Sequence, residues 1–321
     1  MSELDPRLDP QLAGLLALVQ GSGAPRMHEV TPDEARAMFR AMTVDFRDHS
    51  RVPQLESVTE ATVPGGDGER PARIYRPRAG DLPTVVFFHG GGWVIGDLDT
   101  HDLTCRTIAS LCDAVVLSVD YRLAPEHPFP AAVEDALAAT RWAADHTAEL
   151  GGSDVLAVAG DSAGGNLSAV VAQERRDAGE RLDAQLLIYP GTDMLAELPS
   201  RTENAEGYFL DMPTMTWFAV NYLGAETDPA QPRLSPLRGD LAGVAPAVVV
   251  VAQFDPLRDE GTAYAEALAA AEVPVLVEEF DGLIHGFVDM GQHSVAAQQA
   301  IEETCRLFRA LLHPADSGAE E

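Results

Sequence analysis

The sequence predicts an α/β protein in which one mostly parallel sheet carries helices on both faces. Short apolar runs of strand length alternate with longer stretches of helical periodicity from residue 84 to residue 312. Parallel strands need long crossover connections, and the helical stretches between the runs are long enough to provide them. The chain has 321 residues, which is enough to bury a large core.

The first strand of this series is expected at 84–88, TVVFF, because the run is apolar on both faces and glycines follow it. A helix over 103–112 and a strand over 114–121 come next. The later strands are expected over 155–160, 184–190, 246–255 and 274–282, and the later helices over 131–147, 164–179, 261–272 and 294–312.

Two segments depart from this alternation. Residues 1–50 have helical patterns and precede the first strands, and residues 191–240 contain helix-like stretches rich in aromatic side chains. We expect both to pack together as a helical cap over one end of the sheet. The predicted division is therefore an N-terminal part of the cap at 1–50, an α/β domain at 51–190 and 241–321, and a cap insertion at 191–240.

The composition argues against a nucleic-acid partner. The formal net charge is −29 and the chain contains no lysine, so its surface repels phosphate backbones. We interpret this charge as a solvated surface that favours solubility. The hydrophobic content of 46% is that of a folded globular protein.

The compartment expected for the chain is the cytoplasm. The N-terminal residues are acids and prolines where a secretory leader would need a positive start and an apolar run. No stretch approaches the roughly 18 apolar residues of a membrane span. Three cysteines are too few for a disulfide framework, and Cys105 and Cys112 stand about two helical turns apart, too far to bridge.

One serine stands between glycines in the stretch 157–166, AVAGDSAGGN. Ser162 is the centre of a G-x-S-x-G pattern that follows an expected strand and precedes an expected helix, which is the context of a nucleophile elbow. The flanking glycines leave room for the two backbones, and the helix N-terminus favours developing negative charge. Because serine and glycine are common, the prediction also requires a base, an acid and an oxyanion site.

The base and the acid are expected later in the chain than Ser162, at His285 and Asp255. A serine hydroxyl needs a histidine to take its proton and a carboxylate to orient that histidine, in the chain order serine, acid, histidine. Asp255 and His285 each follow an expected strand, so both should lie at the sheet end where Ser162 lies. The rival acids are Asp259, Glu279 and Asp281. Among the other histidines, we expect His101 and His127 to border the pocket.

The segment HGGGW, residues 89–93, supplies the expected oxyanion site. Glycines let a backbone come close to a substrate and aim N–H groups at it. Gly91 and Gly92, together with the N–H of Ala163, are expected to form the oxyanion hole, in a loop shaped by His89 and Gly90. A phosphate-binding loop is excluded, because no lysine follows the glycines.

Several longer segments resemble the bacterial hormone-sensitive lipase-like carboxylesterases, over about residues 70–290. They are FHGGGWVIGDLDTHD, SVDYRLAPEHPFPAAVED, GDSAGGNL, LLIYP, DPLRDEG and HGF. The resemblance implies an α/β-hydrolase fold with a helical cap and a catalytic triad of Ser162, Asp255 and His285. It also implies that Glu126 and Asp161 support the site without reacting.

The expected function is hydrolysis of short- to medium-chain acyl esters through an acyl-enzyme, with a small-molecule ester as the substrate and no metal or cofactor. The residues expected to line the substrate pocket are Trp93, Tyr208, Trp217, Phe218, Leu283 and Ile284. The same triad would serve amide, lactone or carbamate bonds. A non-catalytic binding module, like the plant hormone receptor that shares this fold but lacks the histidine, is the alternative from another class. The resemblance suggests a monomer or a homodimer.

Overall fold

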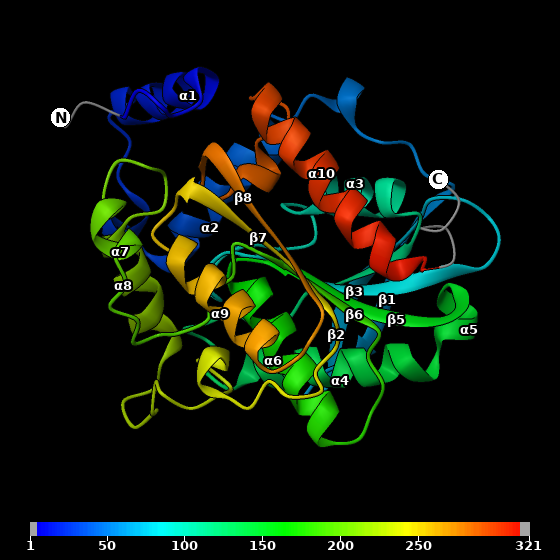
Figure 1. Cartoon of the computed structure of the whole chain (residues 1–321). Helices are drawn as coiled ribbons and strands as arrows, with labels where there is room; N and C mark the ends of the chain where they lie inside the picture. Colours follow the sequence, from blue (N-terminus) through cyan, green and yellow to red (C-terminus); the bar gives the residue numbers. More distant parts are fainter. Residues whose placement is uncertain (1–4, 315–321) are drawn as a thin grey trace.

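The structure, a computed structural model, describes residues 5–314 and confirms the α/β class. The ends of the first and last predicted segments, 1–4 and 315–321, lie outside the described residues. One sheet has the strand order β1-β2-β4-β3-β5-β6-β7-β8 (Figure 1). The strands are β1 (Ser57–Pro64), β2 (Glu69–Arg76), β3 (Leu82–Phe88), β4 (Val115–Val119), β5 (Gly152–Asp161), β6 (Ala184–Ile188), β7 (Ala247–Phe254) and β8 (Val275–Ile284).

Strand β2 pairs antiparallel with β1 and β4, and every other pairing in the sheet is parallel. The helices are α1 (Pro10–Gly21), α2 (Pro32–Arg40), α3 (Asp102–Cys112), α4 (Ala131–Asp145), α5 (Thr147–Leu150), α6 (Ala163–Asp177), α7 (Ser200–Glu203), α8 (Met212–Tyr222), α9 (Arg258–Ala270) and α10 (Val295–Leu312). Short helical turns are η1 (Met27–Glu29), η2 (Ala41–Asp45), η3 (His49–Arg51), η4 (Pro236–Arg238) and η5 (Phe287–Asp289).

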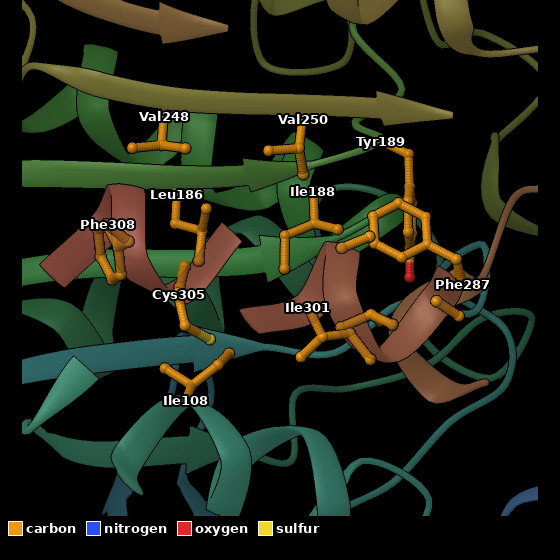
Figure 2. Packing of buried hydrophobic residues seen from close by; sticks show 14 of the residues in the cluster. Ile108, Leu186, Ile188, Tyr189, Val248, Val250, Phe287, Ile301, Cys305 and Phe308 are labelled. Carbon is orange, nitrogen blue, oxygen red and sulfur yellow. The ribbon is translucent and has the colours of Figure 1, made fainter. Parts of the chain in front are cut away.

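Helices cover both faces of the sheet. Side chains of α3 and α10, among them Ile108 and Phe308, form one buried cluster with Leu186 and Ile188 of β6 (Figure 2). Leu187, which lies between those two residues in sequence, belongs to a cluster with α9 on the opposite face. Successive residues of a strand point to opposite faces, so a strand covered on both sides must be apolar throughout. This explains the continuous apolar runs from which the parallel strands were predicted.

The hairpin of β1 and β2 was not located by the sequence analysis. Most positions of its strands are exposed or half-buried, and Glu60 pairs with Arg73 directly across the ladder, at 2.7 Å. A strand that carries charges on an exposed face has no continuous apolar run. The helix expected over 131–147 is also interrupted, because α4 ends at Asp145 and α5 begins at Thr147.

The N-terminal segment and the 191–240 insertion contact each other. His28 Nδ1 lies 3.1 Å from Thr214 Oγ1 at the start of α8, and Arg26 reaches Asp211, the N-cap of that helix. Helix α1 also joins the main core, where Leu12 and Leu16 are buried in the cluster of α3 and α10. In Figure 1, α1, α7 and α8 lie on the left, the side toward which β7 and β8 point. Within residues 5–314, no helix is both long and apolar enough to cross a membrane.

The turn between β5 and α6 requires close contact between backbones. A Cβ atom added at Gly164 would lie 1.8 Å from the carbonyl oxygen of Phe88 in β3, and one added at Gly160 would lie 2.3 Å from the backbone of Gly164. Neither neighbour is a flexible side chain that could move aside. Glycine at these two positions therefore brings α6 against the end of β3.

Replacing Gly164 with alanine should destabilise the protein by about 3 kcal/mol or more, because the added methyl group overlaps a backbone oxygen of the central sheet. Thermal unfolding followed by circular dichroism measures the effect. The control is Gly14→Ala in α1, where no atom lies within 4 Å of the added Cβ. That change should raise stability by about 0.5–1 kcal/mol through helix propensity. Equal melting temperatures for the Gly164 variant and the wild type would contradict the steric argument.

Candidate active site

Ser162 occupies a strained backbone conformation at the junction of β5 and α6. Its φ of 54° and ψ of −116° are rarely adopted by residues other than glycine. Its N–H donates to the carbonyl oxygen of Ile188 at 2.8 Å, and its own carbonyl oxygen accepts from Asn166 at 3.0 Å. The side chain is partly exposed although the residues on either side of it are buried. The turn therefore presents the hydroxyl above the end of the sheet.

His285 connects Ser162 with Asp255. Its Nε2 lies 3.0 Å from Ser162 Oγ, and its Nδ1 lies 2.7 Å from Asp255 Oδ2. Asp255 is fully buried and its other oxygen accepts from the N–H of Leu257 at 2.7 Å. A carboxylate can only accept, so the Nδ1 hydrogen of His285 points to Asp255 and the Nε2 lone pair faces the serine hydroxyl. The three residues thus form one hydrogen-bonded chain that can move the hydroxyl proton to the ring.

The rival acids do not reach His285. Asp259 accepts from the N–H of Ser200 and pairs with Arg258 at the start of α9. Glu279 and Asp281 are exposed on β8, on the strand that ends just before His285. Among the candidate carboxylates, Asp255 alone makes a hydrogen bond to the imidazole in the described part of the chain.

The loop after β3 offers free backbone donors beside Ser162. Gly91 and Gly92 have φ values of 112° and 58°, and their N–H groups, like that of Ala163, donate to no acceptor within residues 5–314. The N–H of Gly90 is already used, because it donates to Asp161 Oδ1 at 2.9 Å. The unused donors are the kind that an oxyanion hole requires.

His89 holds this loop and remains neutral. Its Nδ1 lies 2.8 Å from the carbonyl oxygen of Gly90, and its ring stacks on Tyr121 with centroids 4.3 Å apart. The Tyr121 hydroxyl donates to the carbonyl oxygen of His89 at 2.7 Å. Burial, together with the neighbouring His101, lowers the pKa of His89 to about 4. These contacts leave His89 as a neutral hydrogen-bonding residue of the loop.

Aromatic residues of the insertion lie against the two loops. The Phe218 ring packs on Gly92, where an added Cβ would lie 2.2 Å from the ring. Phe209 approaches Gly286, the residue after His285, in the same way, with 3.2 Å between its ring and an added Cβ. The insertion thus covers both the oxyanion loop, residues 89–93 after β3, and the histidine loop, residues 285–286 after β8.

The other residues predicted to line the pocket have varied surroundings. Trp93 stacks on Tyr222 with centroids 4.5 Å apart, and Trp217 meets the edge of Phe218 at 5.4 Å. Tyr208 stacks on Phe254 at 4.9 Å. Leu283 and Ile284, at the end of β8, are fully buried in the cluster of α3 and α10.

His127 and His101, both expected to border the pocket, lie in different surroundings. His127 lines a groove of about 350 Å³ beside the oxyanion loop, together with Arg36 and Glu126. His101, in contrast, is only 1% exposed and lies next to Asp161 in the interior. The expectation that His101 borders the pocket is therefore wrong, because its ring is surrounded by core residues.

Sequence reasoning missed Arg36, which ties the N-terminal segment to the oxyanion loop. Its guanidinium donates to the carbonyl oxygens of Val94 and Ala124, both at 2.9 Å, and makes two bonds to Glu126 at 2.7 and 2.6 Å. The hydrogen bonds from Arg36 lower the pKa of Glu126 to about 2. Apart from Asp33, three residues earlier, its partners are 58 to 90 residues away, so the local sequence around Arg36 does not mark it.

Tyr189 was also missed as a neighbour of the site. Its ring centroid lies 4.5 Å from that of His285, and its other neighbour is Phe287, at 5.2 Å (Figure 2). Tyr189 follows β6 and so lies at the same sheet end as the other site residues. The segment LLIYP, noted above for its resemblance, contains it.

Comparison with known proteins agrees with this geometry. A family described by the alpha/beta hydrolase fold matches residues 85–289. Carboxylic ester hydrolase LipN of Mycobacterium tuberculosis is 48% identical over 81% of this chain and 72% of its own length. Esterase LipI of the same organism is 46% identical over 96% of both chains.

Among solved structures, an alpha/beta hydrolase enzyme from the metagenome of Lake Arreo, Spain, superposes with a TM-score of 0.91 at 41% identity, covering 95% of this chain and 99% of its own. The region that the family matches, residues 85–289, includes the elbow, the histidine loop and the oxyanion loop. The chain therefore belongs to the alpha/beta hydrolase fold family, and within it to the hormone-sensitive lipase-like carboxylesterases that its motifs resemble.

Proposed function

We propose that the protein is a serine carboxylesterase in which Ser162 is the nucleophile, His285 the general base and Asp255 the acid that orients it. The observation that carries the proposal is the hydrogen-bonded chain from Ser162 Oγ through His285 to Asp255, with distances of 3.0 and 2.7 Å. Similarity over nearly the full length to curated ester hydrolases supports the reaction class.

The reaction follows from the proton positions. His285 takes the Ser162 proton through Nε2 as the oxygen attacks the ester carbonyl. Asp255 accepts the hydrogen on Nδ1 and stabilises the imidazolium. The carbonyl oxygen becomes negative, and the N–H groups of Gly91 and Gly92, with that of Ala163, bind it. Each important donor contributes about 3–4 kcal/mol to the transition state.

The second half of the reaction returns the enzyme to its starting state. The imidazolium of His285 gives its proton to the leaving alcohol, and the acyl group stays on Ser162. His285 then takes a proton from water, which attacks the acyl carbonyl and releases the acid. The Ser162 oxygen recovers a proton from His285.

We further propose that the substrates are small esters with short or medium acyl chains, bound under a two-part cap. The contacts of Phe218 with Gly92 and of Phe209 with Gly286 support this, because aromatic rings limit the space on both sides of Ser162. The bonds of Arg36 and His28 support a cap built from residues 1–50 and 191–240. Trp93, Tyr208 and Trp217 would form the remaining apolar walls.

The remaining proposals concern partners and compartment. The protein is proposed to be a monomer or a homodimer. It is also proposed to bind no nucleic acid, which agrees with the formal net charge of −29. The proposed compartment is the cytoplasm. This agrees with the cysteines, because Cys105, Cys112 and Cys305 are all buried and form no disulfide.

Replacing Ser162 with alanine should lower kcat for p-nitrophenyl butyrate on the order of 10⁵-fold or more, because the reaction loses its nucleophile. The matched control is Ser168→Ala, nearly two turns further along α6, whose buried hydroxyl donates to the carbonyl oxygen of Gly164. That variant should lose about 1 kcal/mol of stability and keep its activity. If the wild type hydrolysed no ester, amide or lactone in a broad panel, a binding module would replace the enzyme.

A Phe218→Ala variant should shift the chain-length preference toward longer acyl groups. The wild type should have a higher kcat/KM on soluble butyrate or hexanoate esters than on long-chain triglyceride emulsions. Removing the ring over Gly92 should raise kcat/KM for decanoate relative to butyrate by about 10-fold. Phe46→Ala, at a position where the side chain is 75% exposed, serves as the control and should leave the ratio unchanged. A wild type that preferred the emulsions would disprove the short-chain proposal.

A further inference from the structure

Next to the elbow lies a cluster of three ionisable side chains that the proposed reaction does not use, of which His101 and Asp161 are buried and Asp289 is half-buried. His101 Nε2 lies 3.5 Å from Asp161 Oδ1 and 3.9 Å from Asp289 Oδ2. These separations are those of close ion pairs rather than of hydrogen bonds. The histidine is 1% exposed, so the interaction takes place away from water.

The hydrogen bonds around the ring indicate which of its nitrogens carry hydrogen. The Thr100 hydroxyl donates its single hydrogen to the carbonyl oxygen of Asp97 at 2.9 Å, and Nδ1 of His101 lies 3.0 Å from the same hydroxyl oxygen. Nδ1 must therefore donate. Nε2 faces two carboxylates, which accept when ionised, so it also carries a hydrogen. A ring with both hydrogens is a cation and has no lone pair for a metal.

Each carboxylate belongs to a different loop of the site. Asp161 directly precedes Ser162, and its Oδ1 also accepts the N–H of Gly90 in the oxyanion loop, at 2.9 Å. Asp289 ends η5, four residues after His285, and its carboxylate accepts from Thr104 of α3 at 2.7 Å. One cation thus lies between the elbow with its oxyanion loop and the turn that follows the catalytic base.

His101 itself has little freedom to move. It is the N-cap of α3, and its carbonyl oxygen accepts the first bond of that helix from Cys105 at 2.9 Å. The rings of Phe39, Phe87 and His89 surround it, with centroids 5.9, 6.2 and 5.3 Å away. A fixed cation and two fixed anions make a rigid link.

We propose that His101 is a positioning residue of the esterase reaction, held as an imidazolium between Asp161 and Asp289, and that it aligns the elbow and oxyanion loop with the histidine loop. It also neutralises a buried carboxylate next to Ser162, where an uncompensated negative charge would oppose the oxyanion. The inference rests on the proposed function, because it assigns a residue to that same reaction.

The charges that face His101 come from several elements. They are Asp97 and His89 in the oxyanion region, Asp161 at the end of β5 and Asp289 of η5, with Arg47 acting on Asp289. Burial would lower the pKa of His101, but the carboxylates of Asp161 and Asp289 outweigh it and raise the pKa to about 9. Burial likewise would raise the pKa of Asp161, but the charge of His101 lowers it. Burial raises the pKa of Asp289.

The direction of the pH dependence follows from a raised histidine pKa. The free energy that the ion pairs contribute to folding is complete below the ordinary value of 6.5 and is lost as the pH rises through about 9. The same deprotonation should lower kcat on the alkaline side, since it leaves the two carboxylates without their cation. His89 stays neutral throughout this range, because its pKa is about 4.

The first test is a proton titration of the His101 ring in the intact wild-type protein, read from the chemical shift of its Cε1–H group. The expected midpoint is near 9, and Asp289→Asn should lower it by about one pH unit. A midpoint at or below 6.5, or one equivalent of tightly bound metal in the purified protein, would overturn the proposal. This measurement needs no variant of His101 and no substrate.

The second test distinguishes a role of His101 in aligning the site from a role in folding stability alone, by comparing kcat with KM. His101→Gln should lower kcat for p-nitrophenyl butyrate by about 10- to 100-fold with little change in KM, less than the loss of a direct oxyanion donor. Asp289→Asn should move the alkaline fall of kcat to lower pH. His293→Asn, at an exposed histidine, is the control and should change neither. Wild-type kcat for the His101 variant would refute the proposal, whereas an inactive wild type would refute the proposed function itself.

Discussion

The site is organised around the positive-φ backbone of Ser162. A residue with a side chain in this conformation costs on the order of 1–3 kcal/mol, so surrounding structure must hold it. The N–H of Ser162 is bonded to β6, while α6 lies against the end of β3 because Gly164 has no side chain. The strain is therefore maintained by three neighbouring strands of the sheet, and the hydroxyl has one fixed position for His285 to meet.

Fixing the serine also fixes the oxyanion loop. Asp161 shares the elbow with Ser162 and accepts the N–H of Gly90, so the loop that carries the free donors moves with the nucleophile. The neutral ring of His89 and the hydroxyl of Tyr121 hold the same loop from the other side. Preorganised donors of this kind stabilise charge in a transition state without rearranging, which is the main source of catalysis in acyl transfer. The ion pairs of His101 extend the same rigidity to the turn after the base.

The N-terminal segment and the insertion act on the site from above the sheet. Arg36 is a planar donor whose separate nitrogens reach two carbonyl oxygens and the carboxylates of Asp33 and Glu126 at once. Phe218 lies directly on a glycine of the oxyanion loop. The same two segments that are irregular in the sequence therefore contact the loops around Ser162, while the regular α/β part carries the residues of the proposed triad.

Residue patterns alone were enough to predict most of the sheet and the three residues of the proposed triad. Continuous apolar runs identified β3 to β7, because strands buried on both faces leave no room for polar side chains. The edge strand β8 has only a short apolar stretch. The positions of Ser162, Asp255 and His285 after expected strands predicted that they lie at one sheet end. The half-exposed hairpin of β1 and β2 lacked a continuous apolar run. The contacts of Arg36, His101 and Phe218, in contrast, could be read only from the folded chain. Their partners are distant in the chain, and a contact between distant residues depends on how the elements pack, which no local pattern of residues records.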